Sequence, residues 1–251
     1  MMWRYLGVAV LMWAGGAWSA QVTVFCPGAV RSVVTGLAQA YQRESGNEVK
    51  LEFGTAGALQ KRAAAGEFAD VVIVTSGGLA ELIKQGKVES SSTRNVGKVG
   101  VGVAVRAGAP EPDIATADAF KAAMLRARSV MYADPALGGQ SGIHVARVFE
   151  RLGIAGEMKP KTVLRPGAPQ GLLEVAKGDI EMGLGQVSEI VAAKGVTLVG
   201  PLPPVLQNTL TFAAGRTTSA RESKAADRFI AELVSPDARQ KFAAAGFESA
   251  D

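Results

Sequence analysis

Four short loops rich in glycine carry most of the chemistry that this sequence offers. They cover residues 26–29, 54–57, 138–142 and 167–170, and each follows a strand-like stretch and precedes a helix-like one. A helix start presents unpaired backbone N–H groups and the positive end of the peptide dipole, so it attracts anions without a charged side chain. The loops therefore predict a site for a small anion.

The energetics require several loops to act together. One helix start stabilises a nearby anion by about 0.3–1 kcal/mol at the surface and about 2 kcal/mol when partly buried. Removing water from an ionised group costs several kcal/mol, whereas each hydrogen bond to a charged group returns roughly 1.5–3 kcal/mol. We therefore expect three or four of the loops to converge on one cleft.

Small and polar residues of the loops and the neighbouring helix starts complete the predicted site. Glycines let the backbone approach a ligand, and hydroxyl and amide groups donate neutral hydrogen bonds. Arg165 is the one cation beside a predicted cleft loop, and its side chain either binds a ligand carboxylate or is solvated or paired between lobes. The predicted ligand-binding residues are Gly28, Ala29, Thr55, Ala56, Ser76, Gln140, Ser141, Gly142, Arg165, Gln170 and Gln186.

The same loops lack the side chains that nucleotide or metal chemistry needs. Residues 138–144, GGQSGIH, have no Lys followed by Ser or Thr, and no G-x-G-x-x-G follows the first strand. No His, Cys, Asp or Glu cluster has metal-ligand spacing. The only histidine, His144, is expected on the polar face of its helix, either solvated or at the edge of the cleft. We expect a binding protein, not an enzyme, with no cofactor and no metal. The alternative is a hydrolase or transferase with Ser141 or Cys26 as nucleophile.

Strand-like runs and amphipathic runs alternate along the chain. Each strand, loop and helix in this order predicts a parallel sheet covered by helices, with all loops at the carboxyl ends of the strands. The expected strands are 21–25, 48–53, 70–74, 98–108, 129–133, 161–164, 180–185 and the last part of 196–215. The helix-like stretches include 58–66, 78–86, 116–127 and 168–178, and two amphipathic helices end the chain.

The strand-like run 98–108 and the stretch 196–215 indicate two crossings between lobes. We expect an α/β protein with two doubly wound lobes joined by a two-strand hinge. Residues 20–99 and 203–251 would form the first lobe and residues 100–202 the second.

The N-terminal residues have the features of a secretory signal. Arg4 provides a positive charge, residues 5–13 are uncharged and mostly apolar, and small side chains at Ala17 and Ser19 favour cleavage after Ser19. The apolar run is shorter than the roughly 18–20 residues that a membrane span needs. We expect a signal peptide at residues 1–19 and a soluble periplasmic protein.

The amino-acid composition limits the classes of binding partner. The formal net charge is +4, and basic residues alternate with acidic ones instead of forming a block, so we expect no nucleic-acid partner. Cys26 is the single cysteine, which excludes an internal disulfide, and we expect it buried at a strand end. We expect a monomer.

Three segments resemble the periplasmic solute-binding proteins of ABC importers, specifically the molybdate-binding type. They are residues 22–76, which open with VTVFCPG, residues 134–142, DPALGGQSG, and residues 174–190, EVAKGDIEMGLGQVSEI. The resemblance implies a type II periplasmic binding fold that closes on an anion and presents it to an ABC permease. A further hypothesis is a sensor or adhesive module with the same fold.

This sequence departs from the molybdate-binding pattern at the ligand. The family usually has a serine after the first strand, a second serine in the next loop and a tyrosine after a late strand. Here these places hold Gly28 and Ala29, Thr55 and Ala56, and Gln186. Because discrimination depends on donor placement, the ligand stays open between molybdate and a small organic anion such as a carboxylate.

Overall fold

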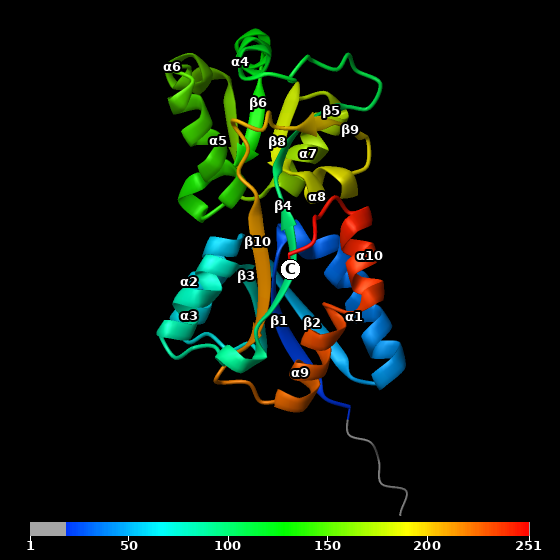
Figure 1. Cartoon of the computed structure of the whole chain (residues 1–251). Helices are drawn as coiled ribbons and strands as arrows, with labels where there is room; N and C mark the ends of the chain where they lie inside the picture. Colours follow the sequence, from blue (N-terminus) through cyan, green and yellow to red (C-terminus); the bar gives the residue numbers. More distant parts are fainter. Residues whose placement is uncertain (1–18, 251) are drawn as a thin grey trace, which may run out of the picture.

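The computed structural model describes residues 19–250 as two α/β lobes, each built around a five-stranded sheet (Figure 1). The predicted signal sequence lies outside the described residues except for Ser19. The prediction of a two-lobed α/β fold is confirmed. Within the described part of the chain, no helix is long and apolar enough to cross a membrane.

The first lobe contains the sheet in the order β2-β1-β3-β10-β4. Strands β2, β1 and β3 are parallel, whereas β10 is antiparallel to both β3 and β4. Its strands are β1 (Gln21–Pro27), β2 (Glu48–Gly54), β3 (Val71–Thr75), β4 (Arg94–Val99) and β10 (Leu210–Arg216). Its helices are α1 (Arg31–Ser45), α2 (Ala56–Ala64), α3 (Ser76–Lys84), α9 (Ser223–Glu232) and α10 (Pro236–Ala244), with 3-10 turns η1 (Gly28–Val30) and η2 (Ser90–Ser92).

The second lobe contains the sheet in the order β7-β6-β8-β5-β9. Strands β7, β6 and β8 are parallel, and β5 is antiparallel to β8 and β9. Its strands are β5 (Val101–Arg106), β6 (Val130–Ala133), β7 (Thr162–Arg165), β8 (Met182–Gln186) and β9 (Val196–Pro201). Its helices are α4 (Ala117–Arg126), α5 (Gln140–Arg151), α6 (Ala155–Met158), α7 (Ala168–Lys177) and α8 (Val187–Ala192), with 3-10 turns η3 (Pro135–Leu137) and η4 (Lys159–Lys161).

The parallel strands expected from the strand–loop–helix units are present in both sheets, and the crossings between the lobes explain the added antiparallel strands. Parallel strands such as β1 and β3 end at the cleft, whereas β10 and β5 arrive from the other lobe and therefore start there. A strand that starts at the cleft must run antiparallel to those that end there. The lobe limits near residues 100 and 203 stay a prediction.

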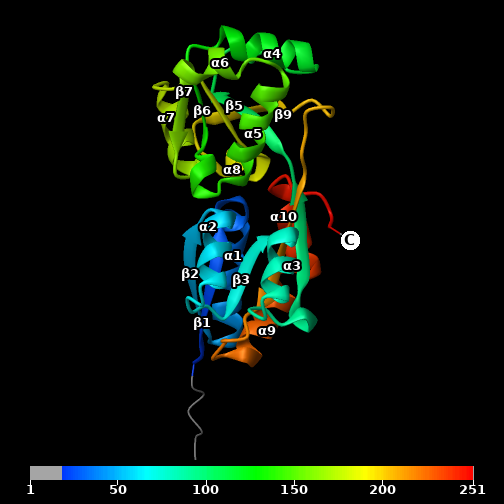
Figure 2. The same cartoon turned by 90° about the vertical axis from the view of Figure 1, so that its left-hand side faces the viewer.

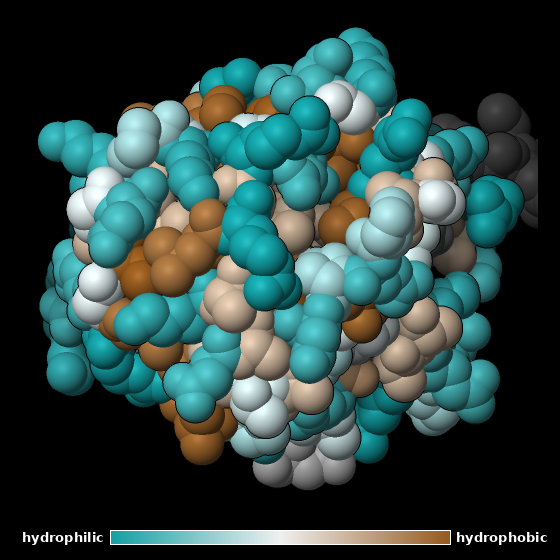
Figure 3. All heavy atoms as spheres, turned by 90° about the horizontal axis from the view of Figure 1, so that it is seen from above, coloured by the Kyte–Doolittle hydropathy of each residue, from teal (hydrophilic) through white to brown (hydrophobic). Residues whose placement is uncertain are grey.

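Alternation along the strands buries both faces of each sheet. In β3, Val71 and Ile73 pack with α1, α9 and α10, while Val72 and Val74 pack with α2 and α3. The second sheet likewise packs against α4, α5 and α6 on one face and against α7 and α8 on the other. Figure 2 shows the two helix-covered sheets stacked end to end. Seen from the outer end of the second lobe, the surface is mostly hydrophilic, with apolar residues in small groups (Figure 3).

Two segments cross between the lobes and lie side by side. Strand β4 continues into β5 through Gly100, and residues 202–209 lead from β9 back to β10. The side-chain amide of Gln207 accepts from the N–H of Val101 at 2.9 Å and donates to its carbonyl at 2.8 Å. This pair of bonds replaces a strand-to-strand pairing and ties the two segments of the hinge together.

Candidate functional site

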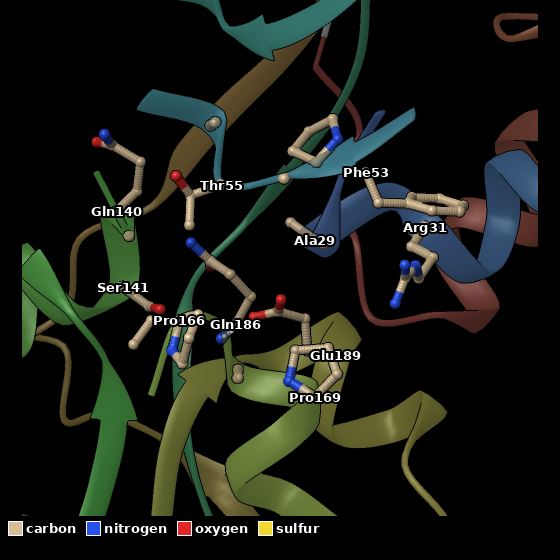
Figure 4. A pocket seen from close by; sticks show the side chains of 18 of the residues that line it. Ala29, Arg31, Phe53, Thr55, Gln140, Ser141, Pro166, Pro169, Gln186 and Glu189 are labelled. Atoms are coloured by element: carbon tan, nitrogen blue, oxygen red, sulfur yellow. Dashed lines mark hydrogen bonds between the residues drawn. The ribbon is translucent and has the colours of Figure 1, made fainter. Parts of the chain in front are cut away.

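A cavity of about 300 Å³ lies between the lobes, where the parallel strands of both sheets end. Loops and helix starts of both lobes form its wall (Figure 4). Its size is at the lower end of the roughly 300–1,000 Å³ that small-molecule sites span. The lining residues are Pro27, Gly28, Ala29, Arg31, Phe53, Gly54, Thr55, Ala56, Ala133, Gly139, Gln140, Ser141, Pro166, Gly167, Ala168, Pro169, Gln170, Gln186, Glu189 and Phe212.

The second-lobe helices that open on this cavity begin without side-chain caps. Gly139 precedes α5 and Gly167 precedes α7, and within residues 19–250 no side chain caps either helix. By contrast, Thr116 caps α4 and Ser235 caps α10, both away from the cavity lining. A helix start without a cap leaves backbone donors for a ligand. The geometry thus supplies anion-binding groups on the second-lobe side.

Eight of the predicted site residues line the cavity. They come from all four glycine-bearing loops and from the end of β8, so the structure brings together segments that are far apart in the sequence. They are Gly28, Ala29, Thr55, Ala56, Gln140, Ser141, Gln170 and Gln186. Their part in ligand binding stays a prediction.

Three predicted residues do not line the cavity. Ser76 is exposed at the start of α3. Gly142 is buried in α5, where a Cβ would collide with the carbonyl of Ala133, so it serves close packing of helix on strand. Arg165 points its guanidinium at Glu174, with both hydrogen bonds at 2.7 Å, and this pair holds it outside the lining. The structure therefore shows Arg165 paired within the second lobe, and its contact with a ligand stays a prediction.

The expected donor role of Thr55 also needs correction. Its hydroxyl accepts from the N–H of Ala58 at 3.1 Å and so caps α2. The same hydroxyl donates to the carbonyl of Leu137 in the second lobe. Its one proton is therefore used between the lobes, and Thr55 contributes shape to the cavity wall instead of a free donor.

Arg31 is the cation that the sequence analysis missed. It is the first residue of α1, is exposed, and its guanidinium lies 3.7 Å from the centroid of the Phe53 ring. Among the described residues that line the cavity, it is the only cation. The signal was its place in the first helical turn after a glycine loop, where a side chain projects back toward the helix start.

Glu189 is the second residue that was missed, and it is the only carboxyl group among the described lining residues. Its Oε2 accepts from the backbone N–H of Gln186 at 3.3 Å, which is one half of a capping box. Burial raises the pKa of Glu189 to about 7, against the opposing effects of that hydrogen bond and of Arg31. The side chain is therefore about half protonated at neutral pH.

Gln186 presents a second polar group to the cavity. The residue is 3% exposed, and its Oε1 is the one buried side-chain oxygen or nitrogen without a hydrogen-bond partner in the described part of the chain. An unpaired buried amide oxygen costs roughly 1–3 kcal/mol. The capping-box geometry directs this side chain at the backbone N–H of Glu189, so the amide orients the start of α8.

Direct contacts hold the lobes together around the cavity. Ser188 of α8 donates to the carbonyl of Ala29 at 2.7 Å, and the N–H of Gly57 donates to the carbonyl of Gly138 at 3.3 Å. The backbones approach so closely at the second contact that a Cβ on Gly57 would lie 2.9 Å from the Cα of Gly138. The structure therefore shows the lobes closed on each other.

The geometry does not support the nucleophiles considered from the sequence. Cys26 is fully buried at the end of β1, as predicted, and burial raises the pKa of its thiol to about 12, so it is not a thiolate at neutral pH. Ser141 lines the cavity, but His144, the only histidine of the chain, directs Nε2 at the carbonyl of Leu206 at 2.7 Å. His144 is half-buried against the return crossing, so of the two expected places the fully solvated one does not apply. Burial lowers its pKa.

The fold and the site together define a class of protein. Two α/β lobes, joined by two crossing segments and closed over a cavity lined by helix starts, are the architecture of a type II periplasmic solute-binding protein. The chain belongs to the family of bacterial extracellular solute-binding proteins, whose family model matches residues 22–248. The predicted resemblance to this class is confirmed.

The chain is also similar to known structures and to one relative in sequence. It is similar to the periplasmic molybdate-binding protein of Azotobacter vinelandii, with a TM-score of 0.77 and 18% identity over 92% of this chain and 100% of that one. The sulfate-binding protein SubI of Mycobacterium tuberculosis has a TM-score of 0.68 and 18% identity over 92% and 88%. At these identities the likeness establishes the fold alone. An aconitate isomerase of Pseudomonas sp is 31% identical over 90% of this chain and 87% of its own length.

Proposed function

We propose that this protein captures a small organic polycarboxylate between its lobes and delivers it to an ABC permease from the outer side of the membrane. The observation that carries the proposal is the cavity itself, where the uncapped starts of α5 and α7 face η1 and Arg31. Backbone N–H groups and one guanidinium suit carboxylate oxygens.

The hydrogen-bond donors of the cavity wall and the volume of the cavity favour a carboxylate over a tetrahedral metal oxyanion. The hydroxyls of Thr55 and Ser188 are both donated to carbonyls of the opposite lobe. Gly28 and Ala29 have no hydroxyl. Of the two described lining residues that do, Thr55 and Ser141, only Ser141 is left to donate to a ligand. The cavity of about 300 Å³ has the size of a small-molecule site. A six-carbon acid fills that space better than a five-atom oxyanion does.

The relative named aconitate isomerase supports the same ligand class, because aconitate is a tricarboxylate. Gln170 and Gln186 can donate to such a ligand from the second lobe, and Glu189 in its neutral form can donate as well. We therefore take trans-aconitate, cis-aconitate and tricarballylate as the first ligands to test.

Thermal unfolding of the mature protein tests the binding proposal. A ligand at 100 times its Kd stabilises the folded state by about 2.7 kcal/mol, which raises the Tm by about 5–10 °C for a chain of this size. We expect this shift with the three polycarboxylates and a smaller one with molybdate and sulfate. A shift with molybdate and none with any carboxylate would reject the ligand class.

Location and delivery need separate experiments. The family supports an extracytoplasmic protein, and osmotic-shock release with N-terminal sequencing of the released protein tests cleavage after Ser19. For delivery, ATP hydrolysis by candidate permeases in nanodiscs should rise with the loaded protein and not with the ligand alone. A loaded protein that stimulates none of them would favour the sensor or adhesive reading.

A further inference from the structure

We propose that Glu189 is an acid–base catalytic residue that moves a proton between two carbons of the bound polycarboxylate, so that this protein isomerises its ligand. The inference rests on the proposed function for the ligand class. It adds a chemical step that neither the fold nor the binding proposal requires. It also differs from the sequence-based alternative, which placed catalysis on Ser141 or Cys26.

The geometry gives Glu189 one anchored and one available oxygen. Oε2 accepts from the N–H of Gln186, which orients the carboxyl group at the start of α8. Oε1 faces Gly28 across the seam between the lobes, in the space that a Cβ on Gly28 would occupy. In Figure 4 the carboxyl group projects from the second lobe toward Ala29. A ligand in the cavity thus meets an oriented carboxyl group and not a solvated surface side chain.

The protonation state suits proton transfer in both directions. With a pKa of about 7, Glu189 exists in both its ionised and neutral forms at neutral pH. A group with this property can accept a proton from carbon and return it, and such catalysis contributes about 10²–10⁴-fold in rate. Arg31 is the charged group that acts on it across the seam, and Gln186 faces it from its own strand end.

The step balances without a co-reactant. Ionised Glu189 removes a proton from the CH₂ group next to the ligand double bond, and the C–H electron pair spreads over the three-carbon unit and its carboxylate. Neutral Glu189 then returns the proton to the far carbon of that unit. One C–H bond breaks, another forms and the double bond moves by one position. In an aconitate skeleton this shift regenerates the same connectivity and interconverts the cis and trans forms.

The surroundings stabilise the charge that develops in this step. The negative charge moves onto carboxylate oxygens, which the starts of α5 and α7 and the Arg31 guanidinium can hold. Closure of the lobes excludes water from the intermediate. Because Glu189 is the only carboxyl group on the described cavity wall, the same group must remove and return the proton.

Proton NMR of trans-aconitate incubated with the wild-type protein tests the proposal. We expect cis-aconitate to appear in both H₂O and D₂O, with little deuterium entering the ligand in D₂O because the shielded carboxyl group returns the proton that it removed. Glu189→Gln should bind the ligand in calorimetry but convert it about 10²–10⁴-fold more slowly. Glu150→Gln, an exposed change at the far end of α5, is the matched control and should convert at the wild-type rate.

A second variant and a pH profile keep the test decisive if Glu189→Gln fails to fold. Glu189→Asp keeps the acid but withdraws it by one methylene, so binding should persist while conversion slows at least tenfold. In the wild type, kcat/KM should rise with pH and level off above about pH 7, because the ionised form is the base.

The outcomes separate this inference from the proposed function. Binding without conversion in the wild type overturns the inference and leaves the binding proposal standing. Conversion by Glu189→Gln at the wild-type rate overturns the role of Glu189. If no polycarboxylate binds to the wild type, both proposals fall.

Discussion

The Glu189 carboxyl group of the second lobe occupies the space in front of Gly28 of the first lobe, where any Cβ would collide with Oε1. The two residues meet only because the lobes are closed, since α8 and η1 belong to different lobes. Ser188, next to Glu189, bonds the carbonyl of Ala29, next to Gly28. This short seam therefore links lobe closure to the position of the one carboxyl group on the described cavity wall.

Gly28→Ala should impair the site without unfolding the protein. The added methyl group meets the flexible end of Glu189 and not backbone, so the carboxyl group swings away or the lobes stay slightly apart. Overpacking of this kind costs typically 1–3 kcal/mol, which corresponds to a loss of about five- to 150-fold in ligand affinity. Calorimetry measures the loss. Gly36→Ala, in α1 with open space around it, is the control and should bind normally.

Gly57→Ala should act on closure alone. Gly57 lies in α2, where alanine is the better helix former by about 1 kcal/mol, so the Tm of the ligand-free protein should stay the same or rise. In the closed state, however, the new Cβ would lie 2.9 Å from the Cα of Gly138, which is backbone and cannot move aside cheaply. We expect weaker ligand binding and a larger radius of gyration with ligand in small-angle X-ray scattering. A variant that closes and binds like the wild type would contradict this account of the contact.

Local patterns were sufficient to predict the fold. The continuous apolar run of β3 and the glycine loops before α2, α5 and α7 are determined by nearest neighbours along the chain, and the structure contains each of them. The antiparallel direction of β10 was not predictable in this way, because it depends on where a strand enters its lobe.

Only the parts of the site that are built from backbone groups could be predicted from the sequence. Glycine loops are recognisable from the sequence. Glu189, in contrast, belongs to the site because it faces Gly28 of the other lobe, and a contact between lobes cannot be predicted from neighbouring residues. The spacing of Gln186 and Glu189 matches a capping box and would have indicated a helix start. Arg165 was predicted from its neighbouring loop, which does line the cavity, whereas Glu174 in the next helix pairs with its side chain and holds it outside the lining.

Arg31→Gln should weaken anion binding, and Arg165→Gln should not. Arg31 lines the cavity mouth and is exposed, so we expect a modest loss of about 1 kcal/mol, or about fivefold in Kd, that shrinks as salt is added. Arg165 lies outside the lining and its partner is Glu174. Titration calorimetry at low and high salt compares the two variants. A larger loss for Arg165→Gln would restore the sequence-based hypothesis.

The free energy of unfolding of the ligand-free protein should depend on pH because of Glu189. Its pKa is about 7 when folded and near 4.5 when unfolded, so the folded state holds the proton more tightly. Stability from this group is present below about pH 4.5 and is lost as the pH rises to about 7. The loss is on the order of 3 kcal/mol. Glu189→Gln should therefore have the higher Tm at pH 8 and match the wild type near pH 4.5. Equal Tm values at pH 8 would show that Glu189 is not strained by burial.

Ligand binding above neutral pH should take up a proton. The carboxyl group of Glu189 is mostly ionised at pH 8, and an arriving anion raises its pKa further because like charges in one cavity repel. Affinity should therefore fall by up to tenfold per pH unit above about pH 7. Calorimetry in buffers of different ionisation enthalpy measures the uptake directly, and we expect up to about one proton per ligand at pH 8 for the wild type. Glu189→Gln should bind with no uptake at a pH-independent affinity, since no other described carboxyl group lines the cavity. Equal uptake by both proteins would assign the proton to the ligand itself.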